Sequence, residues 1–341
     1  MKRFTATALL LICLTGGGVT YWRFFGDKAA AVSPGQKPLQ QGELDFAPFP
    51  QFGIKGFGSK EYNAACRERL VQWLDVRGRD AVNLVAAQDI VRTKVFEQEM
   101  VERFPHDPRV CMAMISSKEN MEMWIERFIA AESDNPAGYL RKAEMLAAAN
   151  KVEAAITAMQ QAAELKVTPD YHLRERLLAV RAAAQAIGLP EWETAMQCSA
   201  VRMLAESLEA VKLLKILRSE IKAAKDSADQ PRVVRFAEMS ATIGFQMSHA
   251  DILTSLGQLV GTEMQIMGLS ELSDGERLAA AQRQKAEFSA LLNRSMESDG
   301  SILKASGPQL MEYVDRLLRD GELPAEVWLG ETVASQPKRT E

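Results

Sequence analysis

The chain has 341 residues, enough for one large or two medium-sized domains. Lysine and arginine total 41 against 45 aspartates and glutamates, so the formal net charge is −4 and no strongly basic surface exists to bind nucleic acid non-specifically. The 47 alanines and the low aromatic content of 7% favour helices and argue against a β-sandwich or barrel. We therefore predict an all-α protein whose partners are proteins rather than nucleic acids.

Residues 1–26 combine a positive start with an apolar stretch. Lys2 and Arg3 precede residues 4–22, which are 19 residues long and just enough to cross a bilayer about 30 Å thick. Basic residues before such a span stay in the cytoplasm, so we predict a membrane-anchored body on the periplasmic or extracellular side. The alternative is a signal peptide cleaved near the small residues 29–31, which would release the body as a secreted protein.

Residues 27–58 form a linker rich in proline and glycine, which disfavour helix. Phe46, Phe49 and Phe52 recur in it at three-residue intervals. They are either part of an extended strap that packs on the first helices or a docking motif for a protein partner. The glycines at 53–58 lack the Gly-Lys-Ser/Thr order of a phosphate loop, so we expect no nucleotide there.

Prolines divide residues 60–188 into helical segments. A capping residue (Asp, Asn or Thr) stands directly before Pro108, Pro136 and Pro169, and a less well capped pair ends at Pro190. Proline is favoured at the first position of a helix, directly after such a cap. The first two intervals, 28 and 33 residues, suit a helix–turn–helix unit.

The segment 135–168 resembles a tetratricopeptide repeat over its 34 residues. Tyr139 stands at the aromatic position of the first helix, and Asn150 occupies the turn, where the family normally has glycine. Residues that suit the crossing of two helices follow at the expected places, namely Ala143, Leu146, Ala155, Met159 and Ala162. The segment departs from the pattern at Lys142, where leucine is usual, and in the displaced Pro169.

The resemblance implies a stack of hairpins, because one hairpin cannot bury its own apolar face. Segments 95–107 and 124–135 look like further second helices, so we predict a short tetratricopeptide-like array over residues 60–188. Such arrays hold a peptide or helix in a concave groove. The resemblance places Leu140, Glu144 and Ala148 on the groove side as protein-binding residues.

Residues 190–330 are predicted to form a C-terminal helical bundle. Apolar residues recur every three or four positions between 201 and 224, which indicates one long amphipathic helix or two with a break near Ser207. This seam either mediates self-association or packs on its own domain. The Met-rich segment 232–269 is either the central hairpin of the bundle or a surface that carries a lipid or another apolar ligand.

The last part of the chain contains helix signals and a polar end. Ser273 with Glu276 three residues later predicts a capping box and a helix to about residue 296. Pro308 opens a further helix to about Arg319. The polar residues 331–341 are predicted to be a disordered tail.

No catalytic motif is present, and we predict no catalytic residue, no metal and no cofactor. The histidines (His106, His172 and His249) are far apart, and the cysteines of the body (Cys66, Cys111 and Cys198) contain no Cys-x-x-Cys pair. We expect these thiols to be small buried hydrophobes, with one disulfide and a leftover thiol as the alternative.

These observations favour one functional hypothesis. The protein is an exported, membrane-tethered helical-repeat scaffold that mediates protein–protein interaction. The alternatives are a carrier of lipid or another apolar ligand through residues 232–269, or an enzyme of unrecognised type.

Overall fold

The computed structural model describes residues 60–115, 120–205, 210–250, 255–297 and 305–335. The chain divides into two units, Met1–Ala65 and Cys66–Glu341. Within the first unit only residues 60–65 are described, so the predicted membrane segment and the phenylalanine linker lie outside the described residues. The account below concerns the second unit.

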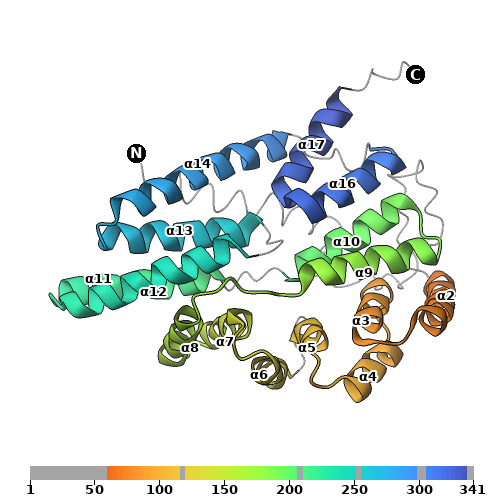
Figure 1. Ribbon diagram of the computed structural model, residues 1–341, viewed down its shortest axis with the longest axis horizontal. Helices are drawn as coiled ribbons and strands as arrows, with labels where there is room; N and C mark the ends of the chain where they lie inside the picture. Colours follow the sequence, from red (N-terminus) through yellow and green to blue (C-terminus); the bar gives the residue numbers. More distant parts are fainter. Residues whose placement is uncertain (1–59, 116–119, 206–209, 251–254, 298–304, 336–341) are drawn as a thin grey trace, which may run out of the picture. The chain divides into compact units, whose positions relative to one another are not determined.

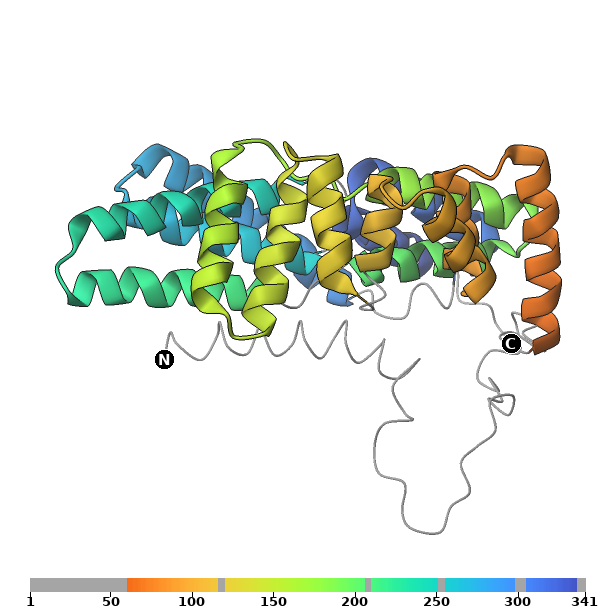
Figure 2. The ribbon, with the colours of Figure 1, turned by 90° about the horizontal axis from the view of Figure 1, so that it is seen from below.

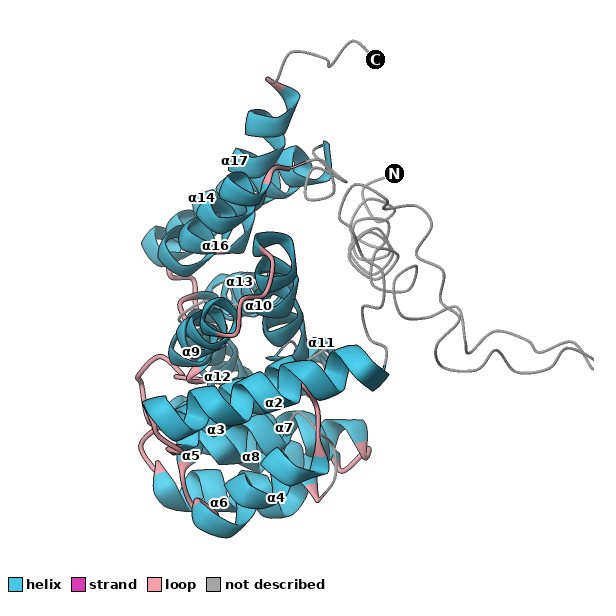
Figure 3. Cartoon of the chain, turned by 90° about the vertical axis from the view of Figure 1, so that its right-hand side faces the viewer, coloured by secondary structure: helices cyan, strands magenta, loops and turns pink. Residues whose placement is uncertain are grey.

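The prediction of an all-α protein is confirmed for the described residues, which form fifteen helices and no strand (Figure 3). Within the second unit the helices lie in three layers (Figure 1). The first layer contains the N-terminal helices: α2 (Lys60–Arg77), α3 (Ala81–Ile90), α4 (Lys94–Arg103), α5 (Pro108–Ile115), α6 (Met121–Ala131), α7 (Pro136–Ala148) and α8 (Val152–Glu164). The second contains α9 (Leu173–Ala186), α10 (Glu191–Ala205), α11 (Ala210–Asp226), α12 (Gln230–Ser248) and α13 (Ser255–Glu271). The third contains α14 (Gly275–Glu297), α16 (Gly307–Asp320) and α17 (Glu322–Ala334).

The first layer consists of three hairpins, α3/α4, α5/α6 and α7/α8, standing side by side (Figure 2). We call α3, α5 and α7 the first helices and α4, α6 and α8 the second helices. In the hairpin α7/α8 the small residues Ala143, Ala155 and Ala162 are fully buried, which lets the two backbones approach closely. Asn150 takes a left-handed φ of 57° in the turn between them, a conformation that asparagine tolerates better than most residues.

Helix starts in the first layer follow the capping chemistry of the sequence. Asn135 accepts a hydrogen bond of 3.0 Å from the backbone N–H of Ala137, and Pro136 is the first residue of α7. Pro108 likewise opens α5. Pro169 does not open a helix, contrary to the sequence prediction: it is buried in an extended linker, and α9 begins only after His172.

The second layer packs on the first helices α3 and α7 and on the second helix α8. Helix α9 contacts α3, α11 contacts α7, and α12 contacts α8 (Figure 1). A common core joins the hairpin α7/α8 to α11, α12 and α13. The seam predicted at 201–224 contributes Leu214, Leu217 and Ile221 to this core, where they are at most 6% exposed. In this structure the seam therefore packs on its own domain, and residues 206–209 near Ser207 lie outside the described residues.

Helices α12 and α13 approach each other very closely. A Cβ built on Gly244 would lie 2.2 Å from the backbone nitrogen of Gln265, and one built on Gly268 would lie 2.3 Å from the carbonyl oxygen of Ala237. The Ser240 hydroxyl donates a hydrogen bond of 2.7 Å to the carbonyl of Met264 across the same contact. Small residues thus set the spacing of this hairpin, which the sequence analysis had described only by its methionines.

Two details of the third layer differ from the sequence predictions. Asp274, rather than Ser273, caps α14 by accepting a hydrogen bond of 3.2 Å from the backbone N–H of Arg277, while Ser273 is in the left-handed region. Helix α17 continues to Ala334 and so includes the first four residues of the tail predicted from residue 331, while residues 336–341 lie outside the described residues. Five buried residues hold this last helix in place, namely Leu323, Ala325, Val327, Leu329 and Gly330.

Candidate functional site

The three groove residues implied by the repeat resemblance lie in different environments. Leu140 is 1% exposed and belongs to the core shared by the first two layers. Glu144 is 6% exposed and forms an ion pair of 2.9 Å with Arg141. Ala148, near the end of α7, is exposed. A partner could therefore reach only Ala148 among the three without displacing the chain's own helices.

The linker between α8 and α9 crosses the ends of the first helices and is fixed by polar contacts. The Asn135 side chain donates a hydrogen bond of 2.8 Å to the carbonyl of Asp170 and accepts one of 3.1 Å from its N–H. His172 Nε2 lies 3.1 Å from the Glu132 carboxylate, which also accepts from Asn135 at 2.7 Å. This network holds His172 in its left-handed conformation, with φ at 54°.

Tyr171 connects the same linker to the buried ion pair on α7. The Arg141 guanidinium lies 5.0 Å from the centroid of the Tyr171 ring. Burial raises the pKa of the Tyr171 hydroxyl well above its ordinary value, although the Arg141 charge opposes the shift. The phenol is thus neutral at physiological pH and cannot serve as a general base.

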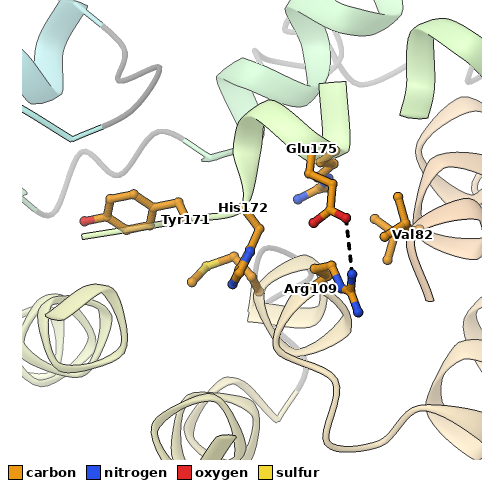
Figure 4. Close-up of a pocket in the computed structure, with 8 residues that line it drawn as sticks. Val82, Arg109, Tyr171, His172 and Glu175 are labelled. Atoms are coloured by element: carbon orange, nitrogen blue, oxygen red, sulfur yellow. Dashed lines mark hydrogen bonds and ion pairs between the residues drawn. The ribbon is translucent and has the colours of Figure 1, made fainter. Parts of the chain in front are cut away.

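Two further ion pairs join the first helices to α9. Arg176 donates two hydrogen bonds of 2.6 Å to the Asp89 carboxylate, and both side chains are under 10% exposed. Arg109 bonds to Asp107 at 2.6 Å. It also bonds to Glu175 at 3.2 Å (Figure 4). Burial alone would raise the pKa of Asp107, but the hydrogen bonds and charge of Arg109 outweigh it and hold that pKa below its ordinary value.

The cavity inside this polar network is too small for a substrate. Its volume is about 10 Å³, the space of about one water molecule, and its walls include Val82, Tyr171 and His172 (Figure 4). The imidazole of His172 and the carboxylate of Glu132 are 3.1 Å apart and partly exposed, but the cavity beside them has no room for a substrate. We conclude that the network positions the linker and closes the second layer onto the first.

A larger cleft lies between α12, α13 and α14. Its volume is about 300 Å³, and Phe245, His249 and Gln265 form one side of it. On the other side Arg277, Gln284 and two alanines come from one face of α14. The methionines that suggested an apolar carrier are elsewhere: Met239, Met247 and Met264 are buried in the core. Among the residues of this cleft, only His249 is named individually in the predictions from the sequence.

The second helices form the most acidic surface of the first layer. Helices α4, α6 and α8 carry seven glutamates against three basic residues, a net charge of −4. One exposed glutamate from each helix, Glu102, Glu122 and Glu153, has no ion pair in the described structure. Helices α3, α5 and α7 carry a net charge of +1. This difference is not visible in the overall composition.

The cysteines of the body that the structure describes are buried, and none of them is in a disulfide. Burial raises the pKa of Cys111 to about 11 and that of Cys198 to about 12. Both thiols are therefore protonated at physiological pH and are poor nucleophiles. The described residues also contain no group of three or more His, Cys, Asp or Glu side chains that could hold a metal ion.

The described helices include none long and apolar enough to cross a membrane, and the predicted membrane segment at residues 4–22 lies outside the described residues. Phe46, Phe49 and Phe52 likewise lie outside the described residues. Comparisons with protein-family models, with curated proteins and with solved structures found no match to this chain.

Proposed function

We propose that the protein is an exported, membrane-tethered scaffold of helical repeats that binds a protein partner through the second helices of its hairpins. The observation that carries this proposal is the covering of α3 by α9 and of α7 by α11, while α12 packs on α8 and leaves its Val152 and Glu153 exposed. The chain's own helices thus occupy the place where a repeat array commonly holds its ligand. The second helices remain as the accessible side of the array.

The chemistry of this side defines the partner. Its net charge of −4 favours a segment rich in lysine and arginine, which it would also attract over a distance. Apolar contacts are available as well, because each second helix exposes one apolar residue in its first turn. Val95 is 57% exposed, and Met123 and Val152 are each 39% exposed. The partner segment should therefore combine basic and apolar side chains.

The tandem hairpins support a scaffold role. Residues 135–168 resemble a tetratricopeptide repeat, and hairpins α3/α4 and α5/α6 stand beside that unit. Stacked hairpins give a long and regular surface on which one partner segment can contact several repeats at once. The active-site alternative has no comparable support, because the polar cluster at His172 encloses the space of only about one water.

The binding proposal can be tested with paired charge-reversal variants of the full chain. The probe is a synthetic amphipathic helix of alternating lysine and leucine pairs, and the readout is its dissociation constant. We expect Glu102→Lys/Glu122→Lys/Glu153→Lys to weaken binding by about tenfold or more, because three attractive charges become repulsive. The wild-type affinity should also fall as salt is raised.

The control triple is Asp226→Lys/Glu238→Lys/Glu287→Lys, in which all three parent side chains are exposed and lie outside the first layer. It makes the same change in net charge, from −4 to +2, as the test triple. The proposal predicts that the control binds as the wild type does. Equal losses in the two triples, or a wild type that does not retain the probe, would overturn it.

The predicted membrane attachment and export of the protein can be tested separately from partner binding. We expect the full chain to stay with the membrane in an alkaline carbonate wash, and a variant lacking residues 2–25 to be released. Alkaline phosphatase fused after Glu341 should be active in a bacterial host, because that enzyme needs an oxidising compartment to form its disulfides. Release of the intact chain by carbonate, or an inactive fusion, would contradict this part of the proposal.

A further inference from the structure

The cleft between α12, α13 and α14 has the size of a small-molecule site. Its volume of about 300 Å³ lies at the lower end of ligand pockets, which run from about 300 to 1,000 Å³. It exists because α14 presents alanines to the hairpin: Ala280 and Ala281 stand between Arg277 and Gln284 on one helical face. Ala281 is the one buried side chain on the described part of α14. Larger residues at these two positions would fill the cleft.

Gln265 gives this cleft an unsatisfied hydrogen-bonding group. The residue is 6% exposed, and its Oε1 has no hydrogen-bond partner. An unpaired buried carbonyl loses its hydrogen bonds to water without replacement, so folded proteins rarely retain one. Gln265 lines the cleft with its Oε1 covered by the cleft wall, so a bound molecule carrying an N–H or O–H would supply the missing donor once the Gln265 amide turns into the cleft.

The adjacent wall of the cleft is aromatic. Phe245 is 42% exposed and stacks on the His249 imidazole, with ring centroids 4.1 Å apart and an interplanar angle of 23°. His249 Nδ1 lies 3.0 Å from the Phe245 carbonyl and 2.9 Å from the Ser248 hydroxyl, and these contacts fix the imidazole in place. A flat ring could stack on this fixed aromatic pair with little loss of side-chain freedom.

Arg277 supplies a positive charge at the mouth of the cleft. Its side chain is 58% exposed, and among the described residues it pairs only with Asp274, at 3.4 Å and three residues earlier on the chain. An exposed pair at this distance is weak, so the guanidinium is available to an anion on a ligand. A carboxylate suits it because arginine binds carboxylates in a bidentate manner.

We propose that the cleft between α12, α13 and α14 binds a small planar aromatic or heteroaromatic carboxylate. The ring stacks against Phe245, a ring N–H or O–H donates to Gln265 Oε1, and the carboxylate pairs with Arg277. This site lies on the opposite side of α12 and α13 from the core methionines, and its chemistry is polar and aromatic rather than that of a lipid carrier. It is independent of the acidic surface of the first layer.

Three matched probes test this proposal on the full chain by isothermal titration calorimetry. Indole-3-acetate has the ring, the N–H and the carboxylate; 1-methylindole-3-acetate lacks the N–H donor, and indole-3-ethanol lacks the charge. We expect indole-3-acetate to saturate the protein below about 10 mM and each of the other two to bind about tenfold more weakly. Ala280→Trp should abolish binding by filling the cleft from an exposed position.

Two glutamine variants distinguish a direct contact between Gln265 and the ligand from an effect on the stability of the fold. Gln265→Leu should remove the preference for indole-3-acetate over its 1-methyl analogue, because the acceptor is gone. Gln246→Leu is the matched control, since Gln246 is also buried with an unpaired Oε1 but donates to the Ala162 carbonyl, away from the cleft. It should lower the unfolding midpoint and keep the preference, whereas Gln265→Leu should leave the midpoint unchanged or raise it.

Two results would overturn the proposal. One is an indole-3-acetate titration that shows no saturation up to about 10 mM. The other is a Gln265→Leu protein that still distinguishes indole-3-acetate from its 1-methyl analogue by the wild-type ratio. Neither result would affect the lysine–leucine probe experiment, because the residues of the cleft and those of the second helices are separate.

Discussion

The first and second helices of the three hairpins have the same local architecture, but they differ in how many of their charged side chains form ion pairs. On α3, α5 and α7 every charged side chain forms an ion pair, and Asp89, Arg141 and Glu144 do so in buried surroundings. On α4, α6 and α8 several glutamates face solvent without an ion pair. The difference arises because the second layer covers α3 and α7, whereas on the second helices it packs on α8 but leaves Glu102, Glu122 and Glu153 exposed. Charge that holds the fold together is thus separated from charge that a partner could use.

The Asp89–Arg176 pair is the sharpest test of this contrast. We expect Asp89→Asn to lower the free energy of unfolding by about 3–5 kcal/mol, because it leaves the Arg176 charge buried and unpaired. Urea denaturation of the full chain would measure the change. The matched change on a second helix is Glu102→Gln, for which we expect a shift within about 0.5 kcal/mol. Similar losses from the two variants would remove the distinction between the two sets of helices.

The close contact of α12 and α13 tests how rigidly the second layer is built over the first helices. Gly244→Ala places a methyl group 2.2 Å from a backbone nitrogen, and we expect it to lower the free energy of unfolding by about 1–3 kcal/mol. Helix propensity alone would raise that free energy by about 0.5–1 kcal/mol, so the two effects have opposite signs.

Gly275→Ala is the control for this variant, because a Cβ at Gly275 meets nothing within 4 Å. We expect it to be neutral or slightly stabilising in the same thermal or urea experiment. A Gly244→Ala variant with a higher free energy of unfolding than the wild type would contradict the close approach of α12 and α13 at this position.

Asn135 tests the attachment of the α8–α9 linker at the end of the first helices. We expect Asn135→Ala to lower the free energy of unfolding by about 1–2 kcal/mol, because it removes both the cap of α7 and the bonds to Asp170. Asn135→Ser keeps a capping oxygen but is too short to reach the linker, so its loss should be smaller. Equal stability of the serine variant and the wild type would mean that the linker bonds contribute little.

The best-paired charge on the second helices should have the smallest effect. Glu99 bonds to Arg79 at 2.7 Å and to Arg103 at 2.8 Å, all three side chains being partly exposed. We expect Glu99→Gln to lower the free energy of unfolding by about 0.2–1 kcal/mol, and 1 M sodium chloride to reduce that difference through screening. A loss comparable to that of Asp89→Asn would contradict the assignment of these pairs to the surface.

Local chemistry made some of the fold predictable from the sequence. The alanine content indicated helices, and Asn135 with Pro136 marked the start of α7 because both residues act through contacts within one turn. Asn150 marked a turn for the same reason. Pro169 failed as a helix signal because burial of the linker, a tertiary effect, decided its conformation.

The candidate sites could not be predicted because they join distant segments. Asp89 and Arg176 are 87 residues apart, and no spacing pattern links them. The apolar periodicity at 201–224 predicted an apolar helix face but not the helices that would cover it. In the structure this face packs on α12 and α7. One signal was available and missed: Gly257, Gly261 and Gly268 recur on α13 at intervals that suit one helical face.

The buried thiols make the first and second layers individually observable. Cys66 lies on α2, Cys111 on α5 and Cys198 on α10, and none is more than 5% exposed. A thiol reagent can alkylate each one only when its surroundings open, so the rate at each cysteine measures a local opening free energy. Mass spectrometry of the alkylated chain would therefore show whether the hairpins separate before the covering helices do, with no engineered label.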